Sequence, residues 1–151
     1  MRTTKSHGKR LEFLTPDDWT LINAKAERLK FTLGQEIIRQ GSVGTTIYII
    51  RSGEAKVQLD SAKSRVILTV LQSDEICGEL TFLDGGTSNA SVSASDDVVE
   101  VDALQATDLR KLFESFTGLG ARFYLSLAVV LARRLRETST ELEREVDRLN
   151  P

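Results

Sequence analysis

The residues best suited to bind a ligand follow Gly78. A strand-like segment runs into Gly78, and a short helix is predicted to begin at Glu79 and to end near Leu83. The first turn of a helix presents backbone N–H groups without intrahelical partners, which suit a phosphate oxygen. The Glu79 carboxylate beside these amides can accept a hydrogen bond from a sugar hydroxyl. The alternative is that Glu79 only stabilises the helix through its dipole.

The elements that would position this segment read mainly as short strands. Apolar or alternating runs are separated by glycines, and they cover residues 36–39, 46–50, 55–59, 66–71, 90–94 and 98–101. About eight short strands at such spacing predict a small sandwich or barrel of jelly-roll type. The dipeptide Ser52-Gly53 predicts a tight hairpin, and Gly85-Gly86 predicts a turn after the short helix.

Helices are predicted on both sides of the strands. Thr15-Pro16-Asp17-Asp18 is a typical helix start, with threonine as the N-cap, proline in the first position and acids in the first turn. Helical periodicity returns over residues 108–116 and again over 121–149. The predicted fold class is therefore mainly β with flanking α-helices.

The long C-terminal helix carries a heptad pattern. Ala128, Leu135, Leu142 and Leu149 recur every seven residues, and the expected alternate core positions are Tyr124, Leu131, Thr138 and Glu145. Such a stripe predicts a coiled-coil contact between two parallel copies of the chain, and hence a homodimer. The last turns would extend beyond the surface of one barrel. The alternative is an amphipathic helix packed only on its own barrel.

Residues 75–92, EICGELTFLDGGTSNASV, resemble the phosphate-binding cassette of cyclic nucleotide-binding domains. In that family Gly-Glu-Leu is followed by a short helix and a Pro-Arg-Ser-Ala-Thr-Val-like strand. The glycines between Gly34 and Gly53 are similarly spaced to those in the opening half of that barrel. The resemblance covers roughly residues 11–140 and implies a double-stranded β-helix, or β-roll.

The same resemblance implies three parts of the chain. Residues 1–10 are expected to form a flexible tail, and residues 11–118 a β-roll with short flanking helices. Residues 119–151 are expected to form a long coiled-coil-type dimerisation helix, as in the catabolite activator family.

The resemblance also implies a ligand such as cAMP or cGMP. The residues implied to bind it are Gly78, Glu79, Leu80, Thr87, Ser88, Asn89 and Ala90. In addition, Thr138 and Ser139 look like the Thr-Ser pair with which the catabolite activator helix contacts adenine, and one of them could reach across from the partner chain. A hydroxyl can both donate and accept, which suits the adenine amino group and ring nitrogen. The alternative is that both are polar residues tolerated at or beside the dimer seam.

Ser88 stands where the family places the arginine that binds the cyclic phosphate. Exchanging a charge-assisted bond for a serine hydroxyl removes roughly 1–3 kcal/mol, or about 5- to 150-fold in affinity. Asn89 could donate its amide instead, but it would not balance the charge. Three explanations remain open: a less anionic ligand, another cation such as Arg122 or Arg133, or a pocket that no longer binds.

Composition excludes several other classes of function. A formal net charge of −2 argues against a dedicated nucleic-acid binder, and no helix-turn-helix is expected after the long helix. The single histidine, His7, cannot form a multi-histidine metal site. Neither a phosphate-binding loop of Walker type nor a nucleophile–base pair is evident, so no enzyme activity and no cofactor are expected. No segment is long and apolar enough to cross a membrane.

The lone cysteine, Cys77, indicates a reducing compartment and is expected to be a small buried apolar residue. We therefore expect a cytoplasmic, non-enzymatic regulatory module that senses a cyclic nucleotide through a non-standard cassette. It would signal through its C-terminal helix to a downstream protein. The alternative is a ligand-independent dimerisation and protein-docking domain.

Overall fold

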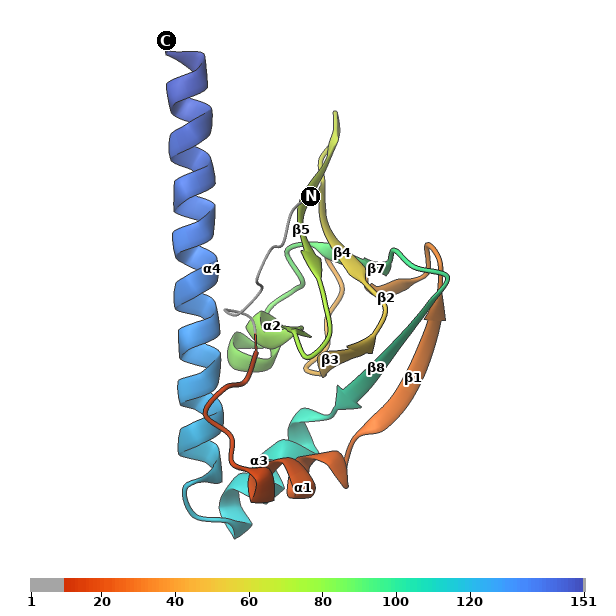
Figure 1. Cartoon of the computed structure of the whole chain (residues 1–151), viewed down its shortest axis with the longest axis vertical. Helices are drawn as coiled ribbons and strands as arrows, with labels where there is room; N and C mark the ends of the chain where they lie inside the picture. The colour runs from red at the N-terminus through yellow and green to blue at the C-terminus, as the bar shows by residue number, and fades with distance from the viewer. Residues whose placement is uncertain (1–9, 151) are drawn as a thin grey trace.

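The computed structural model describes residues 10–150, and it shows two antiparallel sheets rolled against each other with helices on one side (Figure 1). One sheet has the strand order β1-β8-β3-β6, and the other has the order β2-β7-β4-β5. The strands are β1 (Glu27–Thr32), β2 (Glu36–Ile38), β3 (Ile47–Ser52), β4 (Ala55–Asp60), β5 (Arg65–Leu71), β6 (Ile76–Cys77), β7 (Ser91–Ala94) and β8 (Val98–Leu104). This is the mainly β roll that the sequence predicts.

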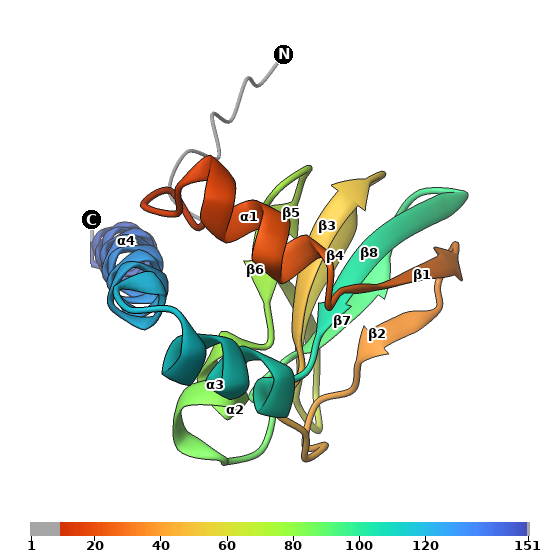
Figure 2. The ribbon, with the colours of Figure 1, turned by 90° about the horizontal axis from the view of Figure 1, so that it is seen from below.

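Four helices complete the described part of the chain: α1 (Pro16–Asn23), α2 (Glu79–Asp84), α3 (Ala106–Ser115) and α4 (Leu119–Leu149). Seen from below, α1 and α3 lie between the roll and the lower end of α4 (Figure 2). Of the predicted tail, residues 1–9 lie outside the described residues. Arg10 forms a β-bridge with Glu75 and so belongs to the folded body.

β1 does not stand out in the sequence, although it pairs with β8 along its whole length, from Glu27 opposite Ala103 to Thr32 opposite Val98. Its apolar residues are Leu29 and Phe31, and both pack against the core inside the roll. Arg28 and Lys30, on either side of Leu29, are positively charged, so the strand reads as a polar segment. A partner strand supplies the acids that neutralise them, which a local pattern cannot reveal.

The predicted hairpin at Ser52-Gly53 is wrong. β3 and β4 belong to different sheets, so this dipeptide carries the chain across a corner of the roll. Gly53 has φ +78°, and a Cβ there would lie 2.6 Å from the carbonyl oxygen of Val98. Glycine is needed because the corner passes so close to β8.

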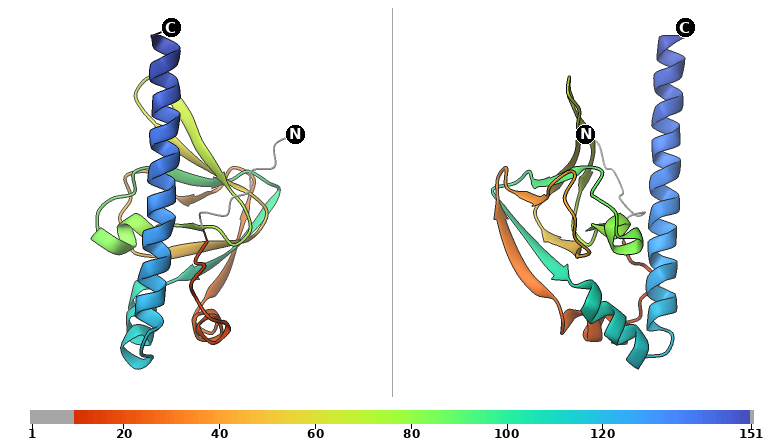
Figure 3. Two further views of the ribbon diagram at one scale, coloured as in Figure 1. Left: turned by 60° about the vertical axis from the view of Figure 1, so that its left-hand side comes forward. Right: turned by 180° about the vertical axis from the view of Figure 1, so that it is seen from behind.

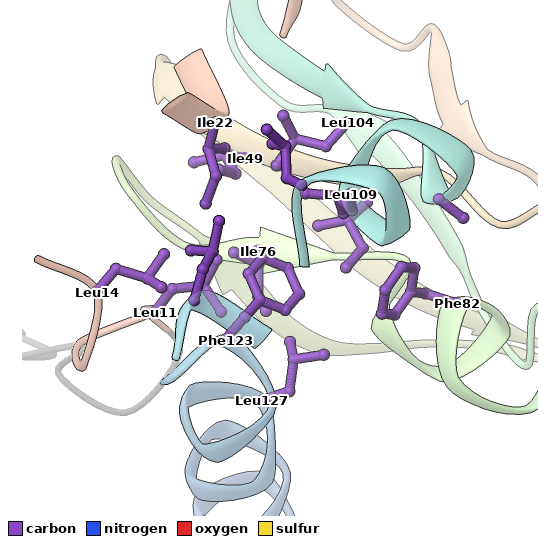
Figure 4. Packing of buried hydrophobic residues seen from close by; sticks show 14 of the residues in the cluster. Leu11, Leu14, Ile22, Ile49, Ile76, Phe82, Leu104, Leu109, Phe123 and Leu127 are labelled. Carbon is purple, nitrogen blue, oxygen red and sulfur yellow. The ribbon is translucent and has the colours of Figure 1, made fainter. Parts of the chain in front are cut away.

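The core has two parts. One fills the interior of the roll, with Ile50 and Val101 among its fully buried residues. The other joins the roll to the helices, and the α4 residues Phe123 and Leu127 insert between β6, α3 and the chain before α1 (Figure 4). The lower half of α4 is therefore part of the hydrophobic core of its own chain.

The upper half of α4 has no surface of its own chain to pack on. Every described residue from Leu135 to Asn150 is exposed. Figure 3 shows this half of α4 rising beyond the roll. α4 thus combines a lower half that packs on its own chain with an exposed upper half, and its last turns extend beyond the roll as the sequence predicts.

α1 is tied to α4 by a buried carboxylate. Asp18 accepts hydrogen bonds from the Thr15 backbone N–H at 2.9 Å, and from Nε and Nη2 of Arg122 at 2.6 and 2.8 Å. Thr15 in turn accepts from the Asp18 N–H, which completes a capping box. The hydrogen bond from Arg122 outweighs burial and lowers the pKa of Asp18 from 3.8 to about 2.

Replacing Asp18 with asparagine should lower the free energy of unfolding by roughly 2–3 kcal/mol at neutral pH, because a cap and a charge-assisted pair are both weakened. The carboxylate has a depressed pKa when folded, so its stabilisation is complete above the unfolded pKa near 3.8 and disappears as the pH falls through about 2. Urea denaturation of both proteins between pH 7 and pH 2 should show this convergence. Asp17→Asn, in the same turn but exposed, is the control, and an equal loss in both variants would contradict the assignment.

Candidate functional site

The cassette is built around α2, which begins at Glu79 and ends at Asp84 as the sequence predicts. Gly78 precedes it with φ +87°, and Gly85 follows it with φ +69°. Both glycines therefore adopt left-handed conformations that L-residues rarely tolerate. They confine α2 to less than two turns and return the chain at once toward β7.

Gly78 is also needed for space. A Cβ on Gly78 would lie 2.4 Å from the carbonyl oxygen of Thr46, just before β3. The close approach holds the first residue of α2 directly beside the start of β3. This backbone contact fixes where the Glu79 side chain leaves the main chain.

Glu79 is buried, with only 5% of its surface exposed, and its carboxylate is paired with Arg134 of α4. Arg134 donates from Nη1 to Glu79 Oε1 and from Nη2 to the carbonyl oxygen of Ile76. A buried carboxylate needs such a partner, because an unpaired charge would be expensive to desolvate. Thus α4 makes polar contact with the cassette through one guanidinium that bonds on both sides of Gly78, in addition to the ring contacts of Phe123 and Tyr124 with Phe82.

The sequence alone does not single out Arg134 as a contact of Glu79, because it is one arginine among several on α4. Its spacing carried a signal, since it lies one helical turn before Thr138, a predicted ligand contact. Thr138 and Ser139 themselves are exposed, and Thr138 Oγ1 donates to the Arg134 carbonyl oxygen at 2.9 Å. Neither residue is buried against the cassette of its own chain.

The second half of the cassette pairs with the loop that follows β2. The backbone carbonyl oxygen of Ser88 accepts a hydrogen bond from the Gly41 N–H at 2.7 Å. The backbone N–H of Ser88 donates to the carbonyl oxygen of Ser42 at 2.9 Å. Thr87 forms a β-bridge with Val43. These bonds hold position 88 at a fixed place opposite residues 41–43. Of the remaining predicted contacts, Leu80 and Asn89 are exposed and Ala90 is buried.

A pocket of about 480 Å³ opens where the loop meets the cassette. Thr81 and Ser88 line it from the cassette, and Arg39 and Ser42 line it from the segment after β2. Tyr48 forms part of its wall, and burial raises the pKa of the Tyr48 phenol. The pocket is polar and large enough for a small charged group.

The two other cations considered from the sequence are engaged elsewhere. Arg122 is bound to Asp18 through two nitrogens. Arg133 forms an ion pair with Glu12 at 3.0 Å. Neither arginine lines the pocket beside Ser88.

Comparison with known proteins decides the family. Residues 28–116 match the family model of the cyclic nucleotide-binding domain. The chain belongs to this family. Its relatives include the cyclic AMP receptor protein of Thermus thermophilus, which is 32% identical over 135 residues that cover 86% of this chain and 58% of the relative. Another is cyclic GMP-binding protein C of Dictyostelium discoideum, 28% identical over 92% of this chain and 6% of the relative.

The crystal structure of the Thermus thermophilus catabolite activator protein superposes on this cyclic nucleotide-binding domain with a TM-score of 0.77 and 29% identity. The match covers 90% of this chain and 62% of that one. The domain therefore spans less than two-thirds of the length of each of these three proteins. Its described residues include no helix that is long and apolar enough to span a bilayer, and no group of ligating side chains arranged for a metal ion.

The exposed face of α4 in this cyclic nucleotide-binding domain includes most of the predicted stripe and a second set of positions at the same spacing. Ala128, Leu135, Leu142 and Leu149 are exposed as expected. Of the expected alternate positions, Tyr124 is 42% exposed and also contacts the rings of Phe82 and Phe113, Leu131 is partly buried, and Thr138 and Glu145 are exposed. A second set of exposed residues also alternates with the predicted four at heptad spacing: Leu125, Ala132, Ser139 and Val146.

The close contact at Gly78 makes a specific prediction for stability. Gly78→Ala should cost roughly 1–2 kcal/mol for the positive φ and more for the clash with Thr46, above about 3 kcal/mol in total. Gly85→Ala is a matched control, because Gly85 also has positive φ but nothing lies within 4 Å of its added Cβ. Chemical denaturation should rank wild type, Gly85→Ala and Gly78→Ala in falling order of stability. Equal losses would show that the contact with Thr46 is unimportant.

Proposed function

We propose that this domain is a regulatory sensor that binds a cyclic nucleotide, such as cAMP or cGMP, in the α2 cassette and signals through α4. The observation that carries the proposal is the contact from Arg134 to Glu79 and to the Ile76 carbonyl. It connects the residue proposed to bind the sugar with the helix proposed to transmit the signal. The names of the relatives, a cyclic AMP receptor and a cyclic GMP-binding protein, support the class of ligand.

The proposed ligand competes for a group that is already occupied. A ribose hydroxyl that donates to Glu79 would share the carboxylate with the Arg134 guanidinium. A ligand shifts a conformational equilibrium only by its difference in affinity for the two states. In this proposal the difference arises at Arg134, which adjusts the position of α4 relative to α2.

We also propose that the domain is a homodimer through the exposed heptad positions of α4, most of which lie in its upper half. The exposed row from Leu125 to Leu149 has the seven-residue repeat of a coiled coil. A second copy would cover these apolar side chains, which water otherwise surrounds. Ser139 lies within the row and Thr138 beside it, so either hydroxyl could reach a base bound in the partner chain.

The proposed role is regulation rather than catalysis, because the relatives are named as receptors and binding proteins. The chain would act on a downstream protein. We propose a cytoplasmic location. Cys77 is buried, and burial raises the pKa of its thiol to about 12, so it remains protonated and unreactive near neutral pH.

Isothermal titration calorimetry with cAMP and cGMP tests the ligand. At least one should give saturable heat at sub-millimolar concentration, and Glu79→Gln should weaken it by about 10- to 150-fold by removing a charged acceptor. Glu114→Gln, on the exposed side of α3, is the control and should bind as wild type. Circular dichroism must show that each variant is folded. Absence of heat from both nucleotides, with an intact dimer, would favour the ligand-independent docking domain instead.

Sedimentation equilibrium tests the dimer. Leu142→Glu should convert it to monomer, because two carboxylates would face each other inside an apolar seam. Thr140→Glu adds the same charge two residues away on the outer face of α4 and should leave the dimer intact. A monomeric wild type, or two variants with the same mass, would refute this contact.

A further inference from the structure

The proposed ligand carries a phosphate, and the cassette offers it no positive charge at position 88. Ser88 can donate one hydroxyl hydrogen bond, but it leaves the phosphate charge unbalanced. Arg122 and Arg133 are paired with acids elsewhere, and Arg134 is committed to Glu79. A cation for the phosphate must therefore come from another element that reaches the same pocket.

Arg39 meets this requirement by position. It lines the pocket of about 480 Å³ together with Ser88 and Thr81 of the cassette. Among the described residues that line this pocket, Arg39 is the one with a positive charge, and its ion-pair partner Glu36 is the one with a negative charge. Its guanidinium carries five N–H donors in a planar fork that matches phosphate oxygens.

The backbone around Arg39 is fixed relative to Ser88. Ser42 binds the Arg39 carbonyl oxygen twice, from its hydroxyl at 2.6 Å and from its N–H at 3.0 Å. Gly41 and Ser42 are then bonded to the backbone of Ser88. Hydrogen bonds from Ser42 to Arg39, and from residues 41–42 to Ser88, thus hold the backbone of Arg39 near position 88, where the cassette has no arginine.

The Arg39 side chain is held only loosely in the present structure. Its Nε lies 3.2 Å from Glu36 Oε1, and 77% of the Arg39 side chain is exposed. An exposed ion pair of this kind contributes little to stability, because water and salt screen the two charges. The guanidinium can therefore leave Glu36 for a doubly coordinated phosphate at small cost.

We infer that Arg39 supplies the guanidinium that binds the phosphate of the ligand, in place of an arginine at position 88. The inference rests on the proposed function and names the phosphate contact of that site. Ser88 and Ser42 then act as neutral donors beside the guanidinium. The cation is delivered from the strand β2 side of the pocket, across the backbone ladder that joins residues 41–42 to 88.

The test compares ligands with and without a phosphate. Arg39→Gln should weaken binding of cAMP or cGMP, whichever the wild type binds, by about tenfold or more. Binding of the corresponding nucleoside, adenosine or guanosine, should be unchanged, because it has no phosphate to lose. The matched control is Arg144→Gln, since Arg144 is equally exposed and also pairs with a glutamate three residues away at 3.2 Å.

A second variant tests the position of the charge. Ser88→Arg in the Arg39→Gln background should restore cyclic nucleotide affinity, because it returns one guanidinium to the same pocket. If wild type binds a cyclic nucleotide and Arg39→Gln binds it equally well, the inference on Arg39 is overturned while the proposed function stands. If wild type binds neither nucleotide, both are overturned. An equal loss for nucleotide and nucleoside would show a structural role for Arg39 and would also overturn it.

Discussion

The proposed signalling depends on one buried ion pair between α4 and the cassette. Arg134 contacts the Glu79 carboxylate and the Ile76 carbonyl, which lie on either side of Gly78. Leaving a buried charge unpaired costs about 3–5 kcal/mol, so this contact is not broken without compensation. A ligand that engages Glu79 must therefore leave Arg134 bound, give it a new acceptor, or move α4. In the proposed mechanism, this ion pair would make the position of α4 depend on whether a ligand occupies the cassette.

The two halves of α4 determine how such a movement could spread. The lower half packs through Phe123 and Leu127 into the shared core and is anchored to α1 by Arg122 and Asp18. The upper half is exposed from Leu135 onward. Arg134 lies at the boundary between them. A displacement there would be resisted by the close packing of the lower half, because a packed core deforms little, and would be passed to the upper half, where the proposed dimer contact lies.

Much of the fold can be predicted from the sequence, because glycine turns, alternating strands and the α1 cap are local signals. The α2 bounds follow from Gly78 and Gly85 for the same reason. What local patterns miss depends on distant partners. β1 can be recognised as a strand only from its pairing with β8. Gly53 is needed at a corner of the roll because its backbone passes close to the carbonyl oxygen of Val98. Likewise, the role of Arg134 requires knowing that α4 passes Glu79. The heptad pattern of α4 shows where apolar residues recur, but it does not show which of these positions pack against the rest of the same chain.

Charge balance explains how the site could function without an arginine at position 88. A phosphate requires a compensating cation nearby, but its sequence position is free as long as the side chain reaches the same volume. In a rolled sheet, β2 and the cassette lie side by side although they are about fifty residues apart, so either can supply it. If Arg39 supplies the positive charge, that charge lies on the segment after β2. Arg134 of α4 contacts Glu79 and Ile76 instead, and not this segment. Phosphate binding and the α4 contact would then be separable, with the sugar acting on the helix and the phosphate contributing affinity alone.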